Sequence, residues 1–160
     1  MKKMIWVQKI VAVLMGILLL IGMTACGEGG QKDAIQQFYS KVEESQELLD
    51  TVADAIYDNW YDAIYNDEFG EDINVAIASA EIDHASDIDE IKALDEEIAE
   101  LYKIVRDTEL SAEVKAVMTA YSDYYEFVIN VSGSFNSYSA EKETLKKELS
   151  SALKDLSFEL

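Results

Sequence analysis

The chain has 160 residues, of which 32 are acidic and 13 basic, so its formal net charge at pH 7 is −19. The length suits one domain behind a short N-terminal segment, and the acidic excess excludes a nucleic-acid-binding protein, which needs basic patches. One histidine and one cysteine exclude a catalytic triad, a zinc site with Cys/His spacing and an intramolecular disulfide.

Residues 1–25 have the layout of a signal peptide. Three lysines stand near the start, namely Lys2, Lys3 and Lys9, and the run 10–23 is apolar and uncharged. Such a basic start, apolar middle and small residues before the cleavage site are typical of exported proteins. The residues Met-Thr-Ala-Cys at 23–26 resemble a bacterial lipobox, in which the cysteine is lipidated and becomes the first mature residue. We therefore expect lipidation at Cys26.

Three alternatives to this lipobox are a transmembrane helix over 5–23, a cleaved signal peptide without lipid, and a cysteine that follows alanine by chance. The transmembrane helix is disfavoured because a span needs about 20 mostly apolar residues and Gln8 and Lys9 interrupt this run. The lipobox predicts a protein anchored by lipid to the extracytoplasmic face of the cell membrane. Its parts are a lipoprotein signal peptide at 1–25, the lipidated cysteine and a short tether at 26–31, and a folded domain at 32–160. Because three of the 13 basic residues leave with the signal, the mature part carries 32 acidic and 10 basic residues, a charge of −22.

The mature part is predicted to be helical. Proline is absent, and only Gly70 and Gly133 follow residue 30, so the two residue types that interrupt helices are nearly missing. Apolar residues recur at alternating steps of three and four, which places them on one side of a helix. The first run is Ile35, Phe38, Val42, Leu49, Val52, Ile56 and Ala63; the second is Ile77, Ala80, Ile91, Leu94, Ile98, Leu101 and Val105, with His84 in phase. The third is Val114, Val117, Tyr121, Tyr124, Val128, Val131, Phe135, Tyr138, Leu145, Leu149, Ala152 and Leu156.

Three stripes on one chain can bury one another, so we predict an all-α fold, an antiparallel three-helix bundle of long helices with coiled-coil-like packing. The first helix should span about 32–66. The second should end near Arg106, where cationic side chains favour a helix C-terminus. Residues 71–82 form either the first turns of this second helix or a separate short helix.

Candidate caps set the remaining boundaries. A separate short helix would require a new start capped by Asp83, Ser86 or Asp87. Ser111 is the expected cap of the third helix. The apolar rhythm continues through Gly133, so we expect one helix over 111–156, bent at most near 132–134.

Two side-chain patterns resemble metal sites. The first, spaced by four residues on one side of the first helix, is Asp50, Asp54, Asp58 and Asp62; a straight row lacks the six to eight converging ligands of calcium, so we interpret it as a solvated face. The second is Glu81-x-x-His84, the spacing used in di-iron bundles, which need two such motifs. With one histidine, we expect His84 to be packed or half-buried, and we predict no metal, no cofactor and no catalytic residue.

Aromatic residues gather near the end of the first helix and in the third. Tyr57 and Trp60 are predicted to face Phe135 and Tyr138 if the two helices start level. We hypothesise that Gly133 leaves room for the Trp60 indole ring. The alternative is a ligand groove with aromatic walls.

Charge is distributed unevenly along the helices. Between Lys41 and Lys92 there are sixteen acidic residues and no lysine or arginine. The opposite end of the bundle should gather Lys32, Lys41, Lys103, Arg106 and Lys115. Because the tether at 27–30 spans at most about 14 Å, the less acidic end should lie next to the membrane.

Two segments resemble a known group of proteins: the stretch 52–65, which contains Trp60-x-x-Ala63-Ile64, and the stretch 130–139, which contains Ser132-Gly133-Ser134. They resemble small, mostly uncharacterised exported proteins of Gram-positive bacteria, some of them lipidated, that carry Trp-x-x-Ala-Ile and Pro-Ser-Gly-Ser segments. Val131 stands here in place of the proline. The resemblance implies a helical extracytoplasmic protein and brings no catalytic residues.

The sequence thus favours a non-enzymatic surface lipoprotein that binds a protein partner or has a structural role in the envelope. Its partners would be the membrane, through the lipid anchor, and a basic protein; we expect neither nucleic acid nor a small-molecule ligand. One alternative is a module that binds a small ligand or a divalent cation. Another is an exclusion or immunity lipoprotein against phage or toxin.

Overall fold

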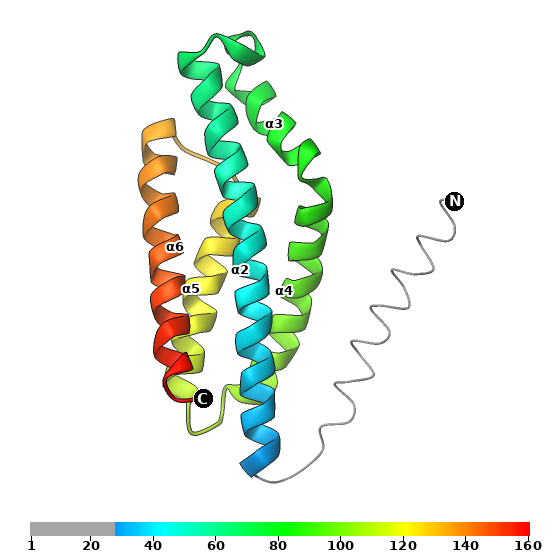
Figure 1. Cartoon of the computed structure of the whole chain (residues 1–160), viewed down its shortest axis with the longest axis vertical. Helices are drawn as coiled ribbons and strands as arrows, with labels where there is room; N and C mark the ends of the chain where they lie inside the picture. The colour runs from blue at the N-terminus through cyan, green and yellow to red at the C-terminus, as the bar shows by residue number, and fades with distance from the viewer. Residues whose placement is uncertain (1–27) are drawn as a thin grey trace, which may run out of the picture.

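Helix α2 is the central helix of the molecule, and the other helices pack along it (Figure 1). The computed structural model describes residues 28–160, so the signal segment and Cys26 lie outside the described residues. The described elements are α2 (Glu28–Tyr65), the short 3-10 helix η1 (Glu68–Glu71), α3 (Ile73–Asp83), α4 (Ala85–Val105), α5 (Ser111–Ile129) and α6 (Phe135–Ser157). Within this part of the chain there is no strand, which confirms the all-α class.

The helices run up and down the molecule (Figure 1). Helix α2 runs from the bottom of the view to the top, α3 and α4 return, α5 runs up and α6 runs down. Helix α2 packs against α3, α4 and α6, and α5 packs mainly against α6. We call the end that holds Glu28, the α4–α5 connection and the C-terminus the proximal end. The opposite end, with the turn after Tyr65, is the distal end.

Helix α2 is much longer than the helices beside it. Its 38 residues span about 57 Å at 1.5 Å per residue. Helices α5 and α6 have 19 and 23 residues, which corresponds to roughly 28–35 Å. The distal turns of α2 therefore extend past α5 and α6, and α3 packs beside them (Figure 1).

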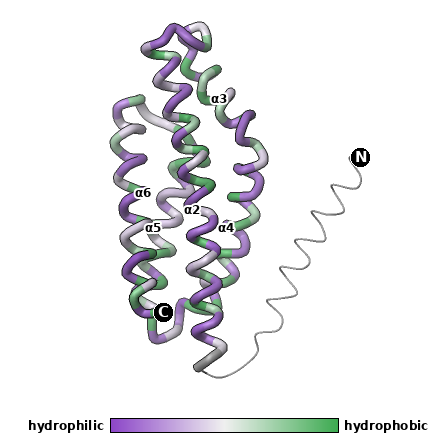
Figure 2. The backbone as a smooth tube through the Cα atoms, in the orientation of Figure 1, coloured by the Kyte–Doolittle hydropathy of each residue, from purple (hydrophilic) through white to green (hydrophobic). Residues whose placement is uncertain are grey.

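The predicted apolar stripes form the core. Every residue of the first stripe is buried, and the second and third stripes are buried or half-buried throughout. In Figure 2 hydrophobic and hydrophilic residues alternate along each helix, as expected when one side of a helix faces its neighbours. The predicted ends of the first two helices, near residue 66 and near Arg106, agree with α2 and α4 within one residue.

Helices α3 and α4 meet at a kink at His84, so residues 73–83 form the separate short helix that the sequence left as one of two alternatives. None of the three candidate caps starts α4, which has no side-chain cap. The capped start is that of α3, where the Asp72 carboxylate accepts hydrogen bonds from the backbone N–H groups of Asn74 and Val75.

The single third helix predicted over 111–156 is wrong. The chain leaves the helical conformation at Asn130 and starts a second, reversed helix at Phe135. Gly133 has a φ of +91°, and Ser134 and Ser137 form a reciprocal capping box at the start of α6. Four long helices and the short α3 therefore replace the expected three-helix bundle. Helix α5 does begin at Ser111 as predicted, but the residue does not act as a side-chain cap.

The turn at the distal end is conformationally strained. Three residues other than glycine have positive φ angles there, namely Asp67 at +55°, Phe69 at +55° and Glu71 at +61°, and Gly70 at +63° lies among them. The left-handed region costs L-residues roughly 1–2 kcal/mol each. The turn is held between two packed helices, since the Asn59 side-chain amide of α2 donates to the Ala76 carbonyl of α3 at 3.2 Å.

Candidate functional site

The distal end of α2 carries a cluster of aromatic rings. Phe135, the first residue of α6, lies against three tyrosines of α2, with ring centroids 5.1 Å from Tyr57, 6.1 Å from Tyr61 and 6.1 Å from Tyr65. Tyr61 and Tyr65 also pack on each other at 4.7 Å. Their rings face solvent, with 41% and 58% of the two residues' surface exposed. This column therefore leaves aromatic surface in contact with solvent, a feature that also occurs at interaction surfaces.

Trp60 lies beneath this column. Its ring is 6.0 Å from Phe135 and 5.5 Å from Tyr138, which confirms the predicted meeting of Tyr57 and Trp60 with Phe135 and Tyr138. The predicted arrangement of two helices that start level is wrong, because α6 is antiparallel to α2. Among the described residues, the Trp60 indole N–H is the only buried side-chain nitrogen or oxygen without a hydrogen-bond partner.

Gly133 does not make room for the Trp60 ring. A β-carbon at this position would meet the Ser137 hydroxyl oxygen at 2.8 Å, and no Trp60 atom is among its nearest neighbours. The glycine is required by its positive φ angle and by the close approach of the capping serine. The hypothesis of a glycine that accommodates the indole is therefore wrong.

The aspartate row of α2 divides into two halves. Asp50 accepts a hydrogen bond from the Tyr124 hydroxyl at 2.7 Å and an ion pair from Lys146 at 3.0 Å. Asp54 pairs with Lys142 at 2.5 Å. The predicted solvated face is therefore wrong for Asp50, whose side chain is only 23% exposed, whereas Asp54 keeps 55% of its side chain exposed while it pairs with α6. Asp58 and Asp62 have no lysine or arginine within ion-pair distance in the part of the chain that the structure describes.

Lys142 occupies a slot built from a carboxylate and a ring. Its side chain is 10% exposed, its Nζ atom binds Asp54, and the same atom lies 4.5 Å from the centre of the Tyr57 ring. A buried ammonium group needs such pairing to offset its desolvation. One turn further along α6, the hydrogen bond to Asp50 raises the pKa of Lys146 above its ordinary value.

The exposed Asp58, Tyr61 and Tyr65, together with the half-buried Asp62 and Phe135, are called the distal surface from here on. Asp62 is ordered by a hydrogen bond of 2.6 Å from the Asn66 side-chain amide. The distal surface is acidic and aromatic, and it lies where the start of α6 meets the last turns of α2. It combines apolar contact area with uncompensated negative charge.

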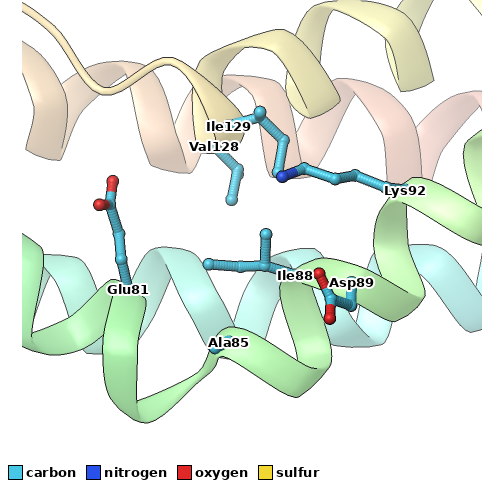
Figure 3. Close-up of a pocket in the computed structure, with 7 residues that line it drawn as sticks. All are labelled: Glu81, Ala85, Ile88, Asp89, Lys92, Val128 and Ile129. Carbon is cyan, nitrogen blue, oxygen red and sulfur yellow. The ribbon is translucent and has the colours of Figure 1, made fainter. Parts of the chain in front are cut away.

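A separate feature is a groove between α4 and the end of α5 (Figure 3). It has a volume of about 340 Å³ and is lined by Glu81, Ala85, Ile88, Asp89, Lys92, Val128 and Ile129. In Figure 3 the Glu81 carboxylate stands at one end of the groove, and the Lys92 side chain reaches across the other end toward Ile129. Ile88 and Val128 face each other between these charges.

Sequence reasoning missed this groove because Ile88 and Ile129 lie on different helices and share no motif. Glu81 and His84, the residues of the Glu-x-x-His motif, do not converge on a metal. His84 is half-buried, as predicted, and its Nδ1 atom lies 2.8 Å from an Asp87 carboxylate oxygen. Over residues 28–160, no three His, Cys, Asp or Glu side chains gather into a group that could hold a metal ion.

Three comparisons with known proteins add no relative. The chain matches no family model, no curated protein and no solved structure. Among the described residues, no helix has the length and apolar character needed to cross a membrane.

Proposed function

We propose that the protein is a non-enzymatic, lipid-anchored extracytoplasmic bundle that binds a basic protein partner through its distal surface. The observation that carries the proposal is the column of the exposed Tyr61 and Tyr65 and the half-buried Phe135, beside two aspartates, Asp58 and Asp62, that have no lysine or arginine partner among the described residues. Interfaces are enriched in aromatic residues. Uncompensated carboxylates favour a partner of opposite charge and disfavour a second acidic copy of this chain.

The first turn of α2 and the distal surface lie at opposite ends of the molecule. Helix α2 begins at the proximal end, two residues after Cys26, and carries the distal surface about 55 Å away along its own axis. A lipid on Cys26 would therefore hold the proximal end at the membrane and present the distal surface outward. This arrangement supports a binding role at a distance from the bilayer.

Lipidation is tested by replacing the cysteine. We expect the full chain, expressed in a Gram-positive host, to incorporate labelled palmitate and to sediment with membranes. Cys26→Ala should lose the label and the membrane association, whereas the neighbouring Thr24→Ser should keep both. Membrane sedimentation of Cys26→Ala equal to that of the unchanged chain would instead support the transmembrane alternative.

Partner binding is tested by photo-crosslinking in intact cells. A benzophenone amino acid at position 65 on the distal surface is compared with one at position 147, which is exposed in the middle of α6. We expect a covalent adduct to one basic protein from position 65 and none from position 147. Equal adducts from both positions, or none from position 65, would contradict the proposal.

The α4–α5 groove favours a second candidate function, the binding of a small amphiphilic ligand. Its apolar middle and opposite charges at the two ends match the pattern of small-molecule sites. A metabolite panel that raises Tm, with the increase removed by Ile88→Glu, would support this function. Calcium, tested in the same panel, should leave Tm unchanged because the carboxylates lie in a row.

A further inference from the structure

We propose that the distal surface recognises two lysine or arginine side chains that stand four residues apart on a helix of the partner. This inference rests on the proposed function and specifies its chemistry. Each cation would be held between one aspartate and one tyrosine of α2, at Asp58 with Tyr61 and at Asp62 with Tyr65.

The molecule already contains one such slot with its cation in place. Lys142 of α6 lies between Asp54 and Tyr57, with its Nζ atom 2.5 Å from the carboxylate and 4.5 Å from the ring centre. The aspartate neutralises the charge, and the ring face attracts the ammonium group through its quadrupole. The slot shows which ligand this pair of side chains accepts.

The sequence of α2 repeats this slot twice. Asp54 precedes Tyr57 by three residues, and the pairs Asp58–Tyr61 and Asp62–Tyr65 follow at steps of four. Residues three or four apart are neighbours on a helix surface, so each aspartate adjoins its tyrosine in all three pairs. The two outer tyrosines pack on each other and on Phe135 but remain 41% and 58% exposed. Their aspartates have no lysine or arginine partner in the described part of the chain, and Asp62 accepts only the Asn66 amide. The outer slots therefore hold no cation of this chain.

Helix α6 also shows which spacing of two basic residues fits the aspartate row of α2. Its Lys142 and Lys146 are four residues apart and pair with Asp54 and Asp50 on the same row of α2. The row continues beyond them, but α6 begins at Phe135 and presents Phe135 and Tyr138 here instead of cations. A partner helix with basic residues at the α6 spacing would extend the same pattern onto Asp58 and Asp62.

The negative charge of this part of the chain indicates which ligand the outer slots can bind. The stretch between Lys41 and Lys92 holds sixteen acidic residues and no lysine or arginine, so neither a second copy of this segment nor a phosphate-bearing surface suits the slots. Isolated cations satisfy the charge but not the spacing of the two rings. A helix that carries two basic side chains on one face satisfies both.

The test uses the full-length chain in non-ionic detergent and two fluorescent helical peptides built from alanine and glutamine. One peptide carries two lysines four residues apart, on one face; the other carries them two residues apart, on different faces, with the same net charge. Fluorescence anisotropy should show the first peptide binding about fivefold tighter, the size expected of cation–π contacts at exposed sites. Equal affinity for the two peptides, or no binding of either, would overturn the inference.

Variants then assign the preference to the slots. Asp58→Asn with Asp62→Asn, and separately Tyr61→Leu with Tyr65→Leu, should bring the affinity ratio of the two peptides to one. The matched control, Asp123→Asn with Glu126→Gln on exposed turns of α5, removes the same charge and should leave the ratio unchanged. If the affinity ratio falls equally in the control, the binding depends on net charge, and the proposal that the slots recognise the two cations is wrong.

The two proposals fail in different ways. Equal peptide affinities together with a crosslink from position 65 would support a basic protein partner but would contradict the recognition of two cations four residues apart. A missing crosslink from position 65 in cells would overturn the proposed function whatever the peptides do. Circular dichroism of each variant checks that the fold is retained.

Discussion

Gly133 and Gly70 both have positive φ angles, yet their surroundings differ. A β-carbon at Gly133 would lie 2.8 Å from the Ser137 hydroxyl oxygen, whereas one at Gly70 would meet nothing within 4 Å. Ser137 is half of the capping box that starts α6. Substitution at Gly133 therefore adds a steric clash and a disturbed cap to the conformational cost that both positions share.

We predict that Gly133→Ala lowers the free energy of unfolding by about 2–3 kcal/mol and that Gly70→Ala lowers it by only about 1 kcal/mol. Urea denaturation followed by circular dichroism measures both. Equal losses at the two glycines would show that the capping box at Ser137 contributes nothing beyond the backbone conformation.

The buried tyrosines make stability sensitive to alkaline pH. Burial raises the pKa of Tyr121, Tyr124 and Tyr138 above the ordinary value of 10.0, and neighbouring carboxylates add to the increase, chiefly Asp95 for Tyr121 and Asp50 for Tyr124. A raised folded-state pKa means that the folded chain holds these protons more tightly than the unfolded chain. The stabilisation is complete below pH 10 and is lost as the pH rises above it.

We therefore predict that the free energy of unfolding falls steeply above pH 10, by up to about 4 kcal/mol per pH unit for three tyrosines. Urea titrations at pH 8, 9.5, 10.5 and 11 measure the slope. Tyr124→Phe should reduce the slope by about a third, because one of the three groups no longer titrates. A slope that Tyr124→Phe leaves unchanged would assign the alkaline loss to other groups, such as Lys146.

At the scale of elements, α6 is held on α2 by an antiparallel polar seam. As the residue numbers rise along α6, those of its partners on α2 fall. Lys142 pairs with Asp54, Lys146 pairs with Asp50, and Ser150 accepts a hydrogen bond from Gln46. The Tyr138 hydroxyl closes the seam by donating to the Ala53 carbonyl at 3.3 Å. These contacts fix the register of α6, because a shift of one turn would separate both ion pairs.

We predict a coupling energy above about 1 kcal/mol between Asp54 and Lys142, because this pair is partly desolvated and is backed by the Tyr57 ring. A double-mutant cycle with Asp54→Asn and Lys142→Gln measures it. The matched control is the exposed pair Glu100–Lys103, at 2.6 Å on α4, for which we expect about 0.5 kcal/mol or less. Similar coupling in both pairs would contradict a special role for the seam.

The apolar stripes predicted the core well because burial imposes a period of three and four residues on any packed helix, whatever its partner. The same rule could not detect the reversal at 130–134. Val131, Phe135 and Tyr138 keep the rhythm, yet Phe135 and Tyr138 belong to a helix that runs in the opposite direction. The stop signal was local, namely a glycine at positive φ and a capping box with serine at both positions, and the usual capping-box pattern has Glu or Gln at its second position.

The candidate site was predictable in part for a related reason. The pairing of Tyr57 and Trp60 with Phe135 was predicted from two helices that start level, a geometry that the structure does not have, although the rings do meet. The sequence did not predict which aspartates of the row form ion pairs. Asp50 and Asp54 differ from Asp58 and Asp62 only in the residues that α6 places opposite them. That difference depends on the length and direction of α6, and both followed from the undetected reversal.

At the scale of the whole molecule, the two ends differ in how their charges are balanced. At the proximal end Lys41 pairs with Glu44 and Glu97, Lys103 with Glu100, and Arg106 with Asp107. Of the five basic residues expected at this end, Lys32 and Lys115 have no ion pair among the described residues. Of these five residues, Lys32 and Lys115 are therefore the ones whose charge is left to attract an anionic bilayer, while the acidic distal end is repelled.

This polarity predicts that the lipidated protein stands upright on a bilayer. Neutron reflectometry on a membrane with about 30% anionic lipid at low salt should show a protein layer near 60 Å thick, the length of α2, rather than the roughly 25 Å of a bundle lying flat. Each lysine near such a surface contributes about 1 kcal/mol. Lys32→Glu with Lys115→Glu should therefore move the layer away from the lipid headgroups, whereas Lys92→Glu with Lys147→Glu, the same charge change away from the proximal end, should not. Added salt should abolish the difference, because a Debye length of about 3 Å at 1 M screens the lysines from the headgroups. If both double variants give the same profile at low salt, orientation is set by the tether and not by the unpaired lysines.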